Sequence, residues 1–140
     1  MGARGFARES AASMLCDVLE PYHIANGALH SVYADPDDAW LVLNISANNS
    51  LNFRADGDDD TIWIMDGPRN VSGVDVSGSV VWREFIGKEL THGWLAMNQQ
   101  GYIDAALLGF GSAIPEVCLS VVASGIKVSR LGEWQRASNP

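Results

Sequence analysis

The sequence predicts an α+β fold: a mainly antiparallel β-sheet of about eight strands, strongly curved, with an N-terminal helix and one short internal helix. Three observations predict it. Apolar residues recur at helical spacing near the N-terminus, between residues 7 and 20. Much of the remaining chain alternates apolar and polar residues with the period of two that is typical of strands. Short polar turns separate these strands, so neighbouring strands are expected to pair antiparallel.

The N-terminal helix is predicted over residues 7–20, where apolar side chains recur every three or four positions and form one stripe. Pro21 ends this helix, because the residue before a proline is disfavoured in helical geometry. The internal helix is expected to begin at Ser79, whose hydroxyl can cap the first turn, and to end before Gly87. Its apolar side would carry Trp82, Phe85 and Ile86.

The predicted strands are short and are bounded by turn residues. They cover residues 27–34, 40–46, 51–54, 61–66, 94–98, 102–107, 116–123 and 125–131. Segment 67–78 is rich in Gly, Ser, Asp and Asn and lacks a regular period, so it is interpreted as a connection. The whole chain, 1–140, is expected to form one domain with frayed tails at 1–6 and 132–140.

The clearest predicted element is the hairpin around Asn98-Gln99-Gln100-Gly101. Asn at the first turn position and Gly at the fourth suit a type I turn closed by a glycine bulge, because glycine adopts the left-handed backbone without steric cost. This turn predicts the pairs Asn98–Tyr102, Ala96–Asp104 and Trp94–Ala106. One face of the hairpin is then apolar, and the other gathers Trp94, Asn98, Tyr102 and Asp104.

The charge of the chain limits its partners. The formal net charge is -8, and the chain has only nine Lys and Arg residues. Neutralising phosphates requires clustered Lys and Arg, so the sequence argues against nucleic acid and anionic membrane as partners. The acidic charge either helps a basic protein partner to bind or serves solubility alone, and both interpretations stay open here. It also shows no export signal and no stretch of membrane-spanning length. A cytoplasmic location is therefore expected, with Cys16 and Cys118 as reduced, buried thiols.

Two acidic turns, at residues 35–38 and 56–60, are candidate binding surfaces. The second turn places aspartates at alternate positions, as in the first half of a calcium loop, but Gly67 stands where the bidentate glutamate is needed. The histidines and cysteines lack the spacing of a zinc site. No metal site and no cofactor are therefore predicted, and Asp58 and Asp60 are assigned to partner binding.

Asp104 is the residue singled out within the hairpin. In the predicted register it projects beside Trp94, Asn98 and Tyr102. A carboxylate among aromatic side chains is either hydrogen-bonded for structural reasons or placed to bind something, and both interpretations stay open here. The sequence contains no nucleophile motif, no phosphate-binding loop and no carboxylate pair with telling spacing, so no catalytic residue is predicted.

A resemblance to small bacterial proteins of unknown function is carried by two stretches: Trp82-Arg-Glu-Phe-Ile-Gly87-Lys-Glu-Leu90, and Trp94 followed by Asn98-Gln-Gln-Gly101-Tyr102-Ile-Asp104. The sequence resembles, more loosely, the compact acidic immunity proteins that bind and neutralise secreted bacterial toxins. The resemblance lies in the last third to half of the chain, and its motifs are structural. It implies no active-site residues, because likeness of fold does not give function.

Three functional hypotheses follow. The first is a small acidic cytoplasmic binding protein, of the immunity type, that holds a basic protein partner. Trp40, Trp63 and Trp94 would be its interface anchors if exposed, and core residues otherwise. The second is an enzyme or small-ligand binder with a pocket in the curved sheet, floored by the N-terminal helix and reaching Asp104. The third is a homodimer formed through a strand edge or a sheet face.

Overall fold

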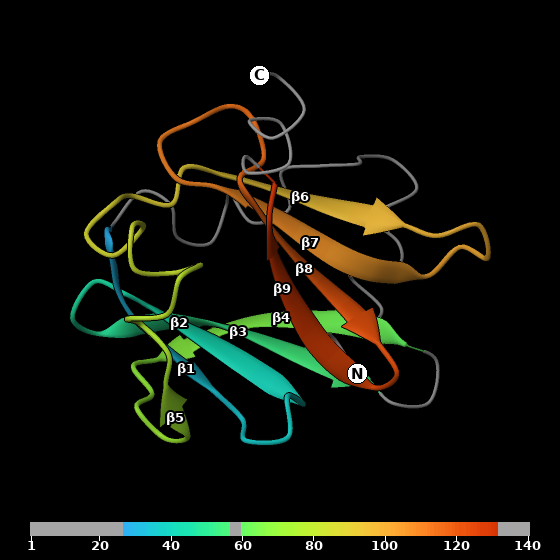
Figure 1. Ribbon diagram of the computed structural model, residues 1–140, viewed down its shortest axis with the longest axis horizontal. Helices are drawn as coiled ribbons and strands as arrows, with labels where there is room; N and C mark the ends of the chain where they lie inside the picture. Colours follow the sequence, from blue (N-terminus) through green and yellow to red (C-terminus); the bar gives the residue numbers. More distant parts are fainter. Residues whose placement is uncertain (1–26, 57–59, 132–140) are drawn as a thin grey trace.

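The computed structural model describes residues 27–56 and 60–131, and this part of the chain forms nine β-strands in two antiparallel sheets (Figure 1). The first sheet consists of β1 (Leu29–Ala34), β2 (Trp40–Ile45), β3 (Asn49–Asp56), β4 (Thr61–Pro68) and β5 (Val74–Asp75), in the spatial order β4-β3-β2-β1-β5. The second sheet consists of β6 (His92–Met97), β7 (Ile103–Gly109), β8 (Val117–Val122) and β9 (Gly125–Arg130), in that order. The eight predicted strands all have a counterpart here, and β5 was not predicted.

The predicted α+β class is wrong for the described residues, which contain no helix and therefore none that could cross a membrane. The single, strongly curved sheet is wrong too, because two open sheets lie face to face instead (Figure 1). An antiparallel sheet with one apolar face needs a cover, and the second sheet supplies it. The helix predicted at 7–20 and the tails predicted at 1–6 and 132–140 lie outside the described residues.

The predicted internal helix is replaced by a series of single turns over residues 79–88. One backbone bond there has helical spacing, from Arg83 N to Ser79 O at 2.9 Å, and the bonds that follow it span three positions. The end of the segment is bound to β1, where Leu29 N donates to Lys88 O at 2.8 Å. Pairing with a distant strand thus overrides the local helix signals, since propensity is only a weak determinant.

The side of this segment that was expected to be apolar is the buried one. Trp82 and Phe85 are 2% and 1% exposed and pack against Phe110, which follows β7. The Phe85 and Phe110 rings stack with centroids 4.8 Å apart, and Trp82 meets Phe110 edge-on at 6.4 Å. Aromatic pairs of this geometry stabilise beyond their buried area. The turns at 79–88 therefore complete the core.

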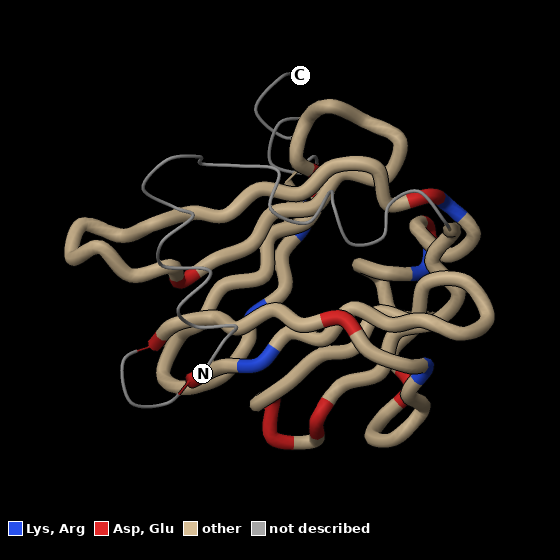
Figure 2. The backbone as a smooth tube through the Cα atoms, turned by 180° about the vertical axis from the view of Figure 1, so that it is seen from behind, with Lys and Arg blue, Asp and Glu red and all other residues tan. Residues whose placement is uncertain are grey.

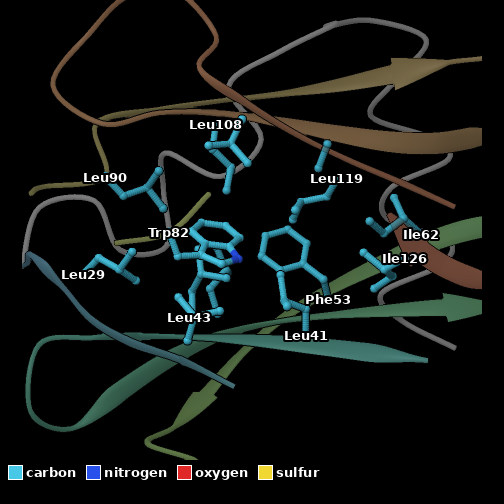
Figure 3. Packing of buried hydrophobic residues seen from close by; sticks show 14 of the residues in the cluster. Leu29, Leu41, Leu43, Phe53, Ile62, Trp82, Leu90, Leu108, Leu119 and Ile126 are labelled. Carbon is cyan, nitrogen blue, oxygen red and sulfur yellow. The ribbon is translucent and has the colours of Figure 1, made fainter. Parts of the chain in front are cut away.

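The core lies between the inner faces of the two sheets (Figure 3). The first sheet contributes Leu41, Leu43, Phe53 and Ile62 among others, and the second contributes Leu95, Leu108, Leu119 and Ile126. Each fully buried side chain of this size stabilises the fold by about 1.5–3 kcal/mol relative to an exposed one. On β2 the predicted alternation is confirmed, because Leu41 and Leu43 face this core whereas Asn44 lies on the opposite face.

The unpredicted strand β5 creates a crossover. β4 and β5 lie at opposite edges of the first sheet, so residues 69–73, the crossover segment, pass over the sheet's outer face, the one turned away from the second sheet. Asn44 fixes this passage with both ends of its carboxamide. Its Nδ2 donates to Asn70 O at 2.8 Å, and Asn70 N donates to its Oδ1 at 2.9 Å. Asn44 is fully buried, so the two bonds satisfy polar groups that water cannot reach.

Hydrogen bonds also fix the far end of the crossover. Val32 N in β1 donates to Ser77 Oγ at 2.8 Å, and Asp75 accepts from Ser77 Oγ and N at 2.6 and 2.9 Å. The Ser77 hydroxyl, followed by the Ser77 backbone N–H, holds the pKa of Asp75 below its usual value. β5 is short, so these side-chain contacts supplement the few ladder bonds between it and β1.

Candidate functional site

The turn of the β6–β7 hairpin has the predicted geometry. Asn98 N donates to Tyr102 O at 2.8 Å, Gly101 N donates to Asn98 O at 3.0 Å, and Gly101 has φ +88°. The Asn98 side-chain oxygen accepts from Gln100 N at 2.9 Å and from Tyr102 N at 3.1 Å. The side chain of Asn98 is therefore occupied in closing its own turn, as is typical of Asn at this position.

The predicted register is confirmed at Asn98–Tyr102 and agrees with the pair Met97–Ile103, but it is wrong by one residue from Ala96 onward. The observed pairs are Met97–Ile103, Ala96–Ala105, Leu95–Ala106 and Trp94–Leu107. Asp104 has no partner across the ladder, because a β-bulge inserts it as an extra residue. The bulge lets both Ile103 and Ala106 face the core, which strict alternation between them would prevent.

The hairpin residues assigned to binding are Trp94, Asn98, Tyr102 and Asp104, here called the hairpin patch. Asn98 Nδ2 reaches Asp104 Oδ2 at 3.4 Å, and each of the four residues is half-buried. Trp94 stacks on His92, with ring centroids 5.8 Å apart, on the outer face of the second sheet. The structure thus joins Asn98 to Asp104 and to the Tyr102 backbone, while Trp94 contacts His92. A binding role for the patch stays a prediction.

Cys118 in β8 lies close enough to Asp104 to be influenced by it. Burial of the thiol, followed by the negative charge of Asp104, raises the pKa of Cys118. Cys118 is a free cysteine, as expected, although it is half-buried instead of buried, and the raised pKa keeps it a thiol at neutral pH. These surroundings do not activate a nucleophile. Cys16 lies outside the described residues.

The two acidic turns lie at the same end of the first sheet, and no pattern in the sequence indicated that the second sheet would contact both of them. Both contact the β8–β9 turn: Ile126 N donates to Asp38 O at 2.8 Å, and Ser124 N reaches Asp60 Oδ1 at 3.3 Å. We call the described carboxylates of these turns the acidic end: Asp35, Asp37, Asp38, Asp56 and Asp60 (Figure 2). Asp58, also assigned to partner binding, lies outside the described residues.

The carboxylates of the acidic end differ in their surroundings. Asp35 Oδ2 accepts from Ala39 N at 3.0 Å, so it helps to close the β1–β2 turn. Asp37, Asp38 and Asp60 are exposed. Among residues 27–56 and 60–131, no three His, Cys, Asp or Glu residues are arranged to hold a metal ion.

An apolar pocket of about 200 Å³ adjoins the acidic end. Asp38 stands on its wall, and most of the other lining residues are apolar: Ala34, Trp40, Leu41, Val76, Val81, Trp82, Ile126 and Val128, with Ser79. The pocket lies where β1 and β2 of the first sheet approach β9 of the second. It could receive one apolar side chain while the nearby carboxylates contact positive charge.

A second pocket, of about 270 Å³, is the feature that sequence reasoning missed. It lies on the outer face of the first sheet, beside the crossover segment, and its lining includes Trp40, Asn52, Arg54, Asn70 and Ser72. Within a strand, the period of two puts Asn52 and Arg54 on one face. Nothing local indicated that residues 70 and 72 would lie over that face, because this depends on β5.

The three tryptophans proposed as anchors are half-buried and lie on outer faces, outside the core. Trp40 lines both pockets, and Trp63 lies across Arg54 from it in the register of the first sheet. The strongly curved sheet that was expected to hold a pocket is absent from the described residues, where core side chains fill the space between the two sheets (Figure 3). The N-terminal helix expected to floor that pocket lies outside the described residues. Neither of the two pockets described above is lined by the hairpin patch.

Comparison with known proteins identifies a family to which the chain is related. Residues 21–135 match a family of unknown function, DUF6334. The chain belongs to this family. The match confirms the expected likeness to a family of unknown function and extends it well beyond the two stretches that carried it. It does not support the looser likeness to immunity proteins. Searches of curated proteins and of solved structures found no significant match.

Proposed function

We propose that this DUF6334 chain is a small acidic binding protein that holds a basic protein partner at its acidic end, as an immunity-type protein holds a toxin. The observation that carries the proposal is that Asp38 and Asp60, from different acidic turns, both contact the β8–β9 turn. Asp38 does so at Ile126 N and Asp60 at Ser124 N. Separate acidic turns on a protein of net charge -8 would serve solubility alone. Carboxylates gathered at one end can steer and orient a positively charged surface.

The apolar pocket beside Asp38 supports the same proposal. Tight protein interfaces commonly place one large side chain in a pocket and surround it with polar contacts. Val122, just before the β8–β9 turn, is 51% exposed and adds apolar surface near the carboxylates. The expected partner surface is therefore basic, with one apolar side chain that can enter the pocket.

The test is affinity capture with the full chain as bait in lysate of its own source cells. A double variant, D38N/D60N, removes two charges from the acidic end. Asn retains a side-chain oxygen, and it tolerates the positive φ of 65° and 53° at these positions. A control, D66N/E89Q, removes two exposed charges elsewhere. We expect a basic protein to bind the wild type and the control, and to bind D38N/D60N at least ten-fold more weakly.

This binding should also weaken at least ten-fold between about 50 and 300 mM NaCl, because charges near the surface are screened by salt. Equal retention by D38N/D60N, or no captured basic protein, would contradict the proposal. Light scattering of the purified chain addresses the homodimer proposed from the sequence, since a dimer would double the mass in the absence of any partner.

The alternative proposal is an enzyme or small-ligand binder at Asp104. It is supported by the bulge, which sets the Asp104 carboxylate apart from the ladder beside Asn98 and near Cys118. Bulges of this kind often re-aim a side chain next to a functional site. If D104N has unchanged ligand binding in a fragment screen, this alternative fails.

A further inference from the structure

We propose that the pocket beside the crossover segment is a binding site for a small organic carboxylate, held by Arg54 against an apolar wall that includes Trp40. The pocket has a volume of about 270 Å³ and is lined by Trp40, Val42, Asn52, Phe53, Arg54, Met65, Asn70 and Ser72. It is distinct from the acidic end, and the site does not depend on the proposed protein partner.

The charge of this pocket is opposite to that of the chain. Arg54 is its one ionised lining residue, and no Asp or Glu contributes to the lining. Within the described part of the chain, the one ion pair seen joins Arg130 to Glu84, and Arg54 is exposed without a carboxylate partner. An unpaired guanidinium at a pocket of a protein with net charge -8 favours an anionic ligand. The planar guanidinium can bind both oxygens of a carboxylate.

The remaining lining residues divide the pocket into two kinds of surface. Trp40, Val42 and Met65 offer apolar contact, and Met65 is 44% exposed at the edge strand β4. Arg54 forms the polar side together with Asn52, whose Nδ2 donates to Ser50 Oγ at 3.0 Å and is thereby held in place. A carboxylate attached to a ring or a short alkyl chain matches this combination. The volume of about 270 Å³ lies slightly below the range of typical ligand pockets, roughly 300–1,000 Å³, so the ligand is small.

The crossover segment holds its side of the pocket in place. Asn70 is fixed to the buried Asn44 by two hydrogen bonds, and Ser72 N and Oγ both donate to Asn70 Oδ1, at 3.0 and 2.7 Å. Gly73 lies so close to Trp40 that an added Cβ would stand 2.5 Å from the indole Cη2. The Trp40 wall and the Asn70–Ser72 wall are therefore set before any ligand arrives, which lowers the ordering cost of binding.

The test is a titration of the ¹⁵N-labelled full chain, followed by two-dimensional NMR. The probes are benzoate, phenylacetate, hydrocinnamate and hexanoate, each paired with its neutral amide. We expect at least one carboxylate to shift the Trp40 indole and Asn52 amide signals saturably, and its amide to bind at least ten-fold more weakly. R54Q should weaken this binding at least ten-fold, whereas R83Q, the same change at another exposed arginine, should leave it unchanged.

Three results would overturn the proposal: no saturable shift at these signals with any of the four carboxylates, equal affinity for acid and amide, or equal affinity in R54Q and the wild type. Arg54 is exposed, and a one-dimensional spectrum of R54Q verifies that the fold is intact. Because neither Asp38 nor Asp60 is changed in this experiment, its result is separate from that of the partner capture.

Discussion

Two asparagines, in two regions of the molecule, use their carboxamides in different ways. Asn98 closes the β6–β7 turn, bonding to residues two and four positions further on. Asn44 bonds to Asn70, twenty-six positions away, and holds the crossover over the first sheet. The first arrangement is local and half-exposed, and the second is buried and joins distant segments. Only the second places a pocket between chain segments that no local pattern connects.

Polar side chains in the hairpin patch bond to one another, whereas Arg54 beside the crossover does not share in the structural hydrogen bonds. In the hairpin patch, the Asn98 oxygen is occupied by its own turn, and its amide nitrogen reaches Asp104. Beside the crossover, the structural bonds are made by Asn44 and Asn70, while Arg54 is left without an ion-pair partner among the described residues. The bonds of Asn98 thus stabilise a turn and occupy its own polar groups. The bonds between Asn44 and Asn70 join distant segments and do not involve Arg54.

The largest expected effect comes from removing the buried asparagine. N44A removes a fully buried carboxamide and leaves the backbone N–H and C=O of the half-buried Asn70 without these partners, so we expect a loss of about 2–4 kcal/mol in the free energy of unfolding. N98A removes a half-exposed turn contact and should cost about 0.5–1.5 kcal/mol. Urea unfolding of both variants measures the difference. Equal losses of unfolding free energy in N44A and N98A would contradict the stronger structural role of the Asn44–Asn70 bonds.

Two glycines give a matched comparison of the same regions. Gly73 and Gly101 have φ of +91° and +88°, but an added Cβ would stand 2.6 Å from Ala34 O at Gly73 and would meet nothing within 4 Å at Gly101. G101A should cost about 1–2 kcal/mol, from backbone strain alone. G73A should cost at least about 1 kcal/mol more, because the clash involves backbone and a ring. Thermal unfolding checks this order, and a reversed order would contradict the close approach at Gly73.

Much of the secondary structure was predictable, because alternation and turn chemistry are local. The eight strands and the Asn98–Gly101 turn were found from the sequence in this way. The prediction of a helix from Ser79 to the residue before Gly87 was wrong, because Leu29 N bonds to Lys88 O and a distant strand decides the conformation. The predicted hairpin register was wrong by one residue from Asp104 onward, because the bulge there lets both Ile103 and Ala106 pack in the core.

The arrangement in space was not predictable. β5 has two residues and a Gly/Ser/Asp-rich surrounding, so it leaves no periodic signal. Without β5 there is no crossover, and without the crossover Arg54 is merely an exposed residue on a strand. The two acidic turns lie at the same end because β1 to β4 form an antiparallel meander, in which Ala55 N donates to Ala39 O. Their shared contact with the β8–β9 turn, through Ile126 and Ser124, depends on the packing of the second sheet against the first and had no local signal.

A smaller effect is expected at the hairpin patch. The Asp104 charge is the second cause, after burial, of the raised pKa of Cys118. D104N should lower this pKa and increase the rate of Cys118 alkylation by iodoacetamide at pH 8, because the thiolate is the reacting form. The rate is measured across pH in a C16S background, so that Cys118 is the only thiol. An unchanged pH–rate profile would mean that Asp104 does not act on Cys118.

The smallest effect is expected at the far end of the crossover. The folded-state pKa of Asp75 lies below the ordinary value of 3.8 for an aspartate, so its contribution to stability is present above that value and is lost as the pH falls through the folded pKa. D75N should therefore flatten the decline of stability below about pH 4 while retaining an acceptor for Ser77. Urea midpoints between pH 6 and 3 test this. Parallel curves for wild type and variant would show that Asp75 does not contribute to the pH dependence of stability.

The central claim is that the partner binds where distant acidic turns meet, and hydrogen–deuterium exchange on the complex with the captured basic partner tests it most directly. We expect added protection at residues 35–41 and 122–126, around Asp38 and Ser124, with little change at 92–104 in the hairpin. Protection concentrated at 92–104, with residues 35–41 and 122–126 unchanged, would contradict the claim.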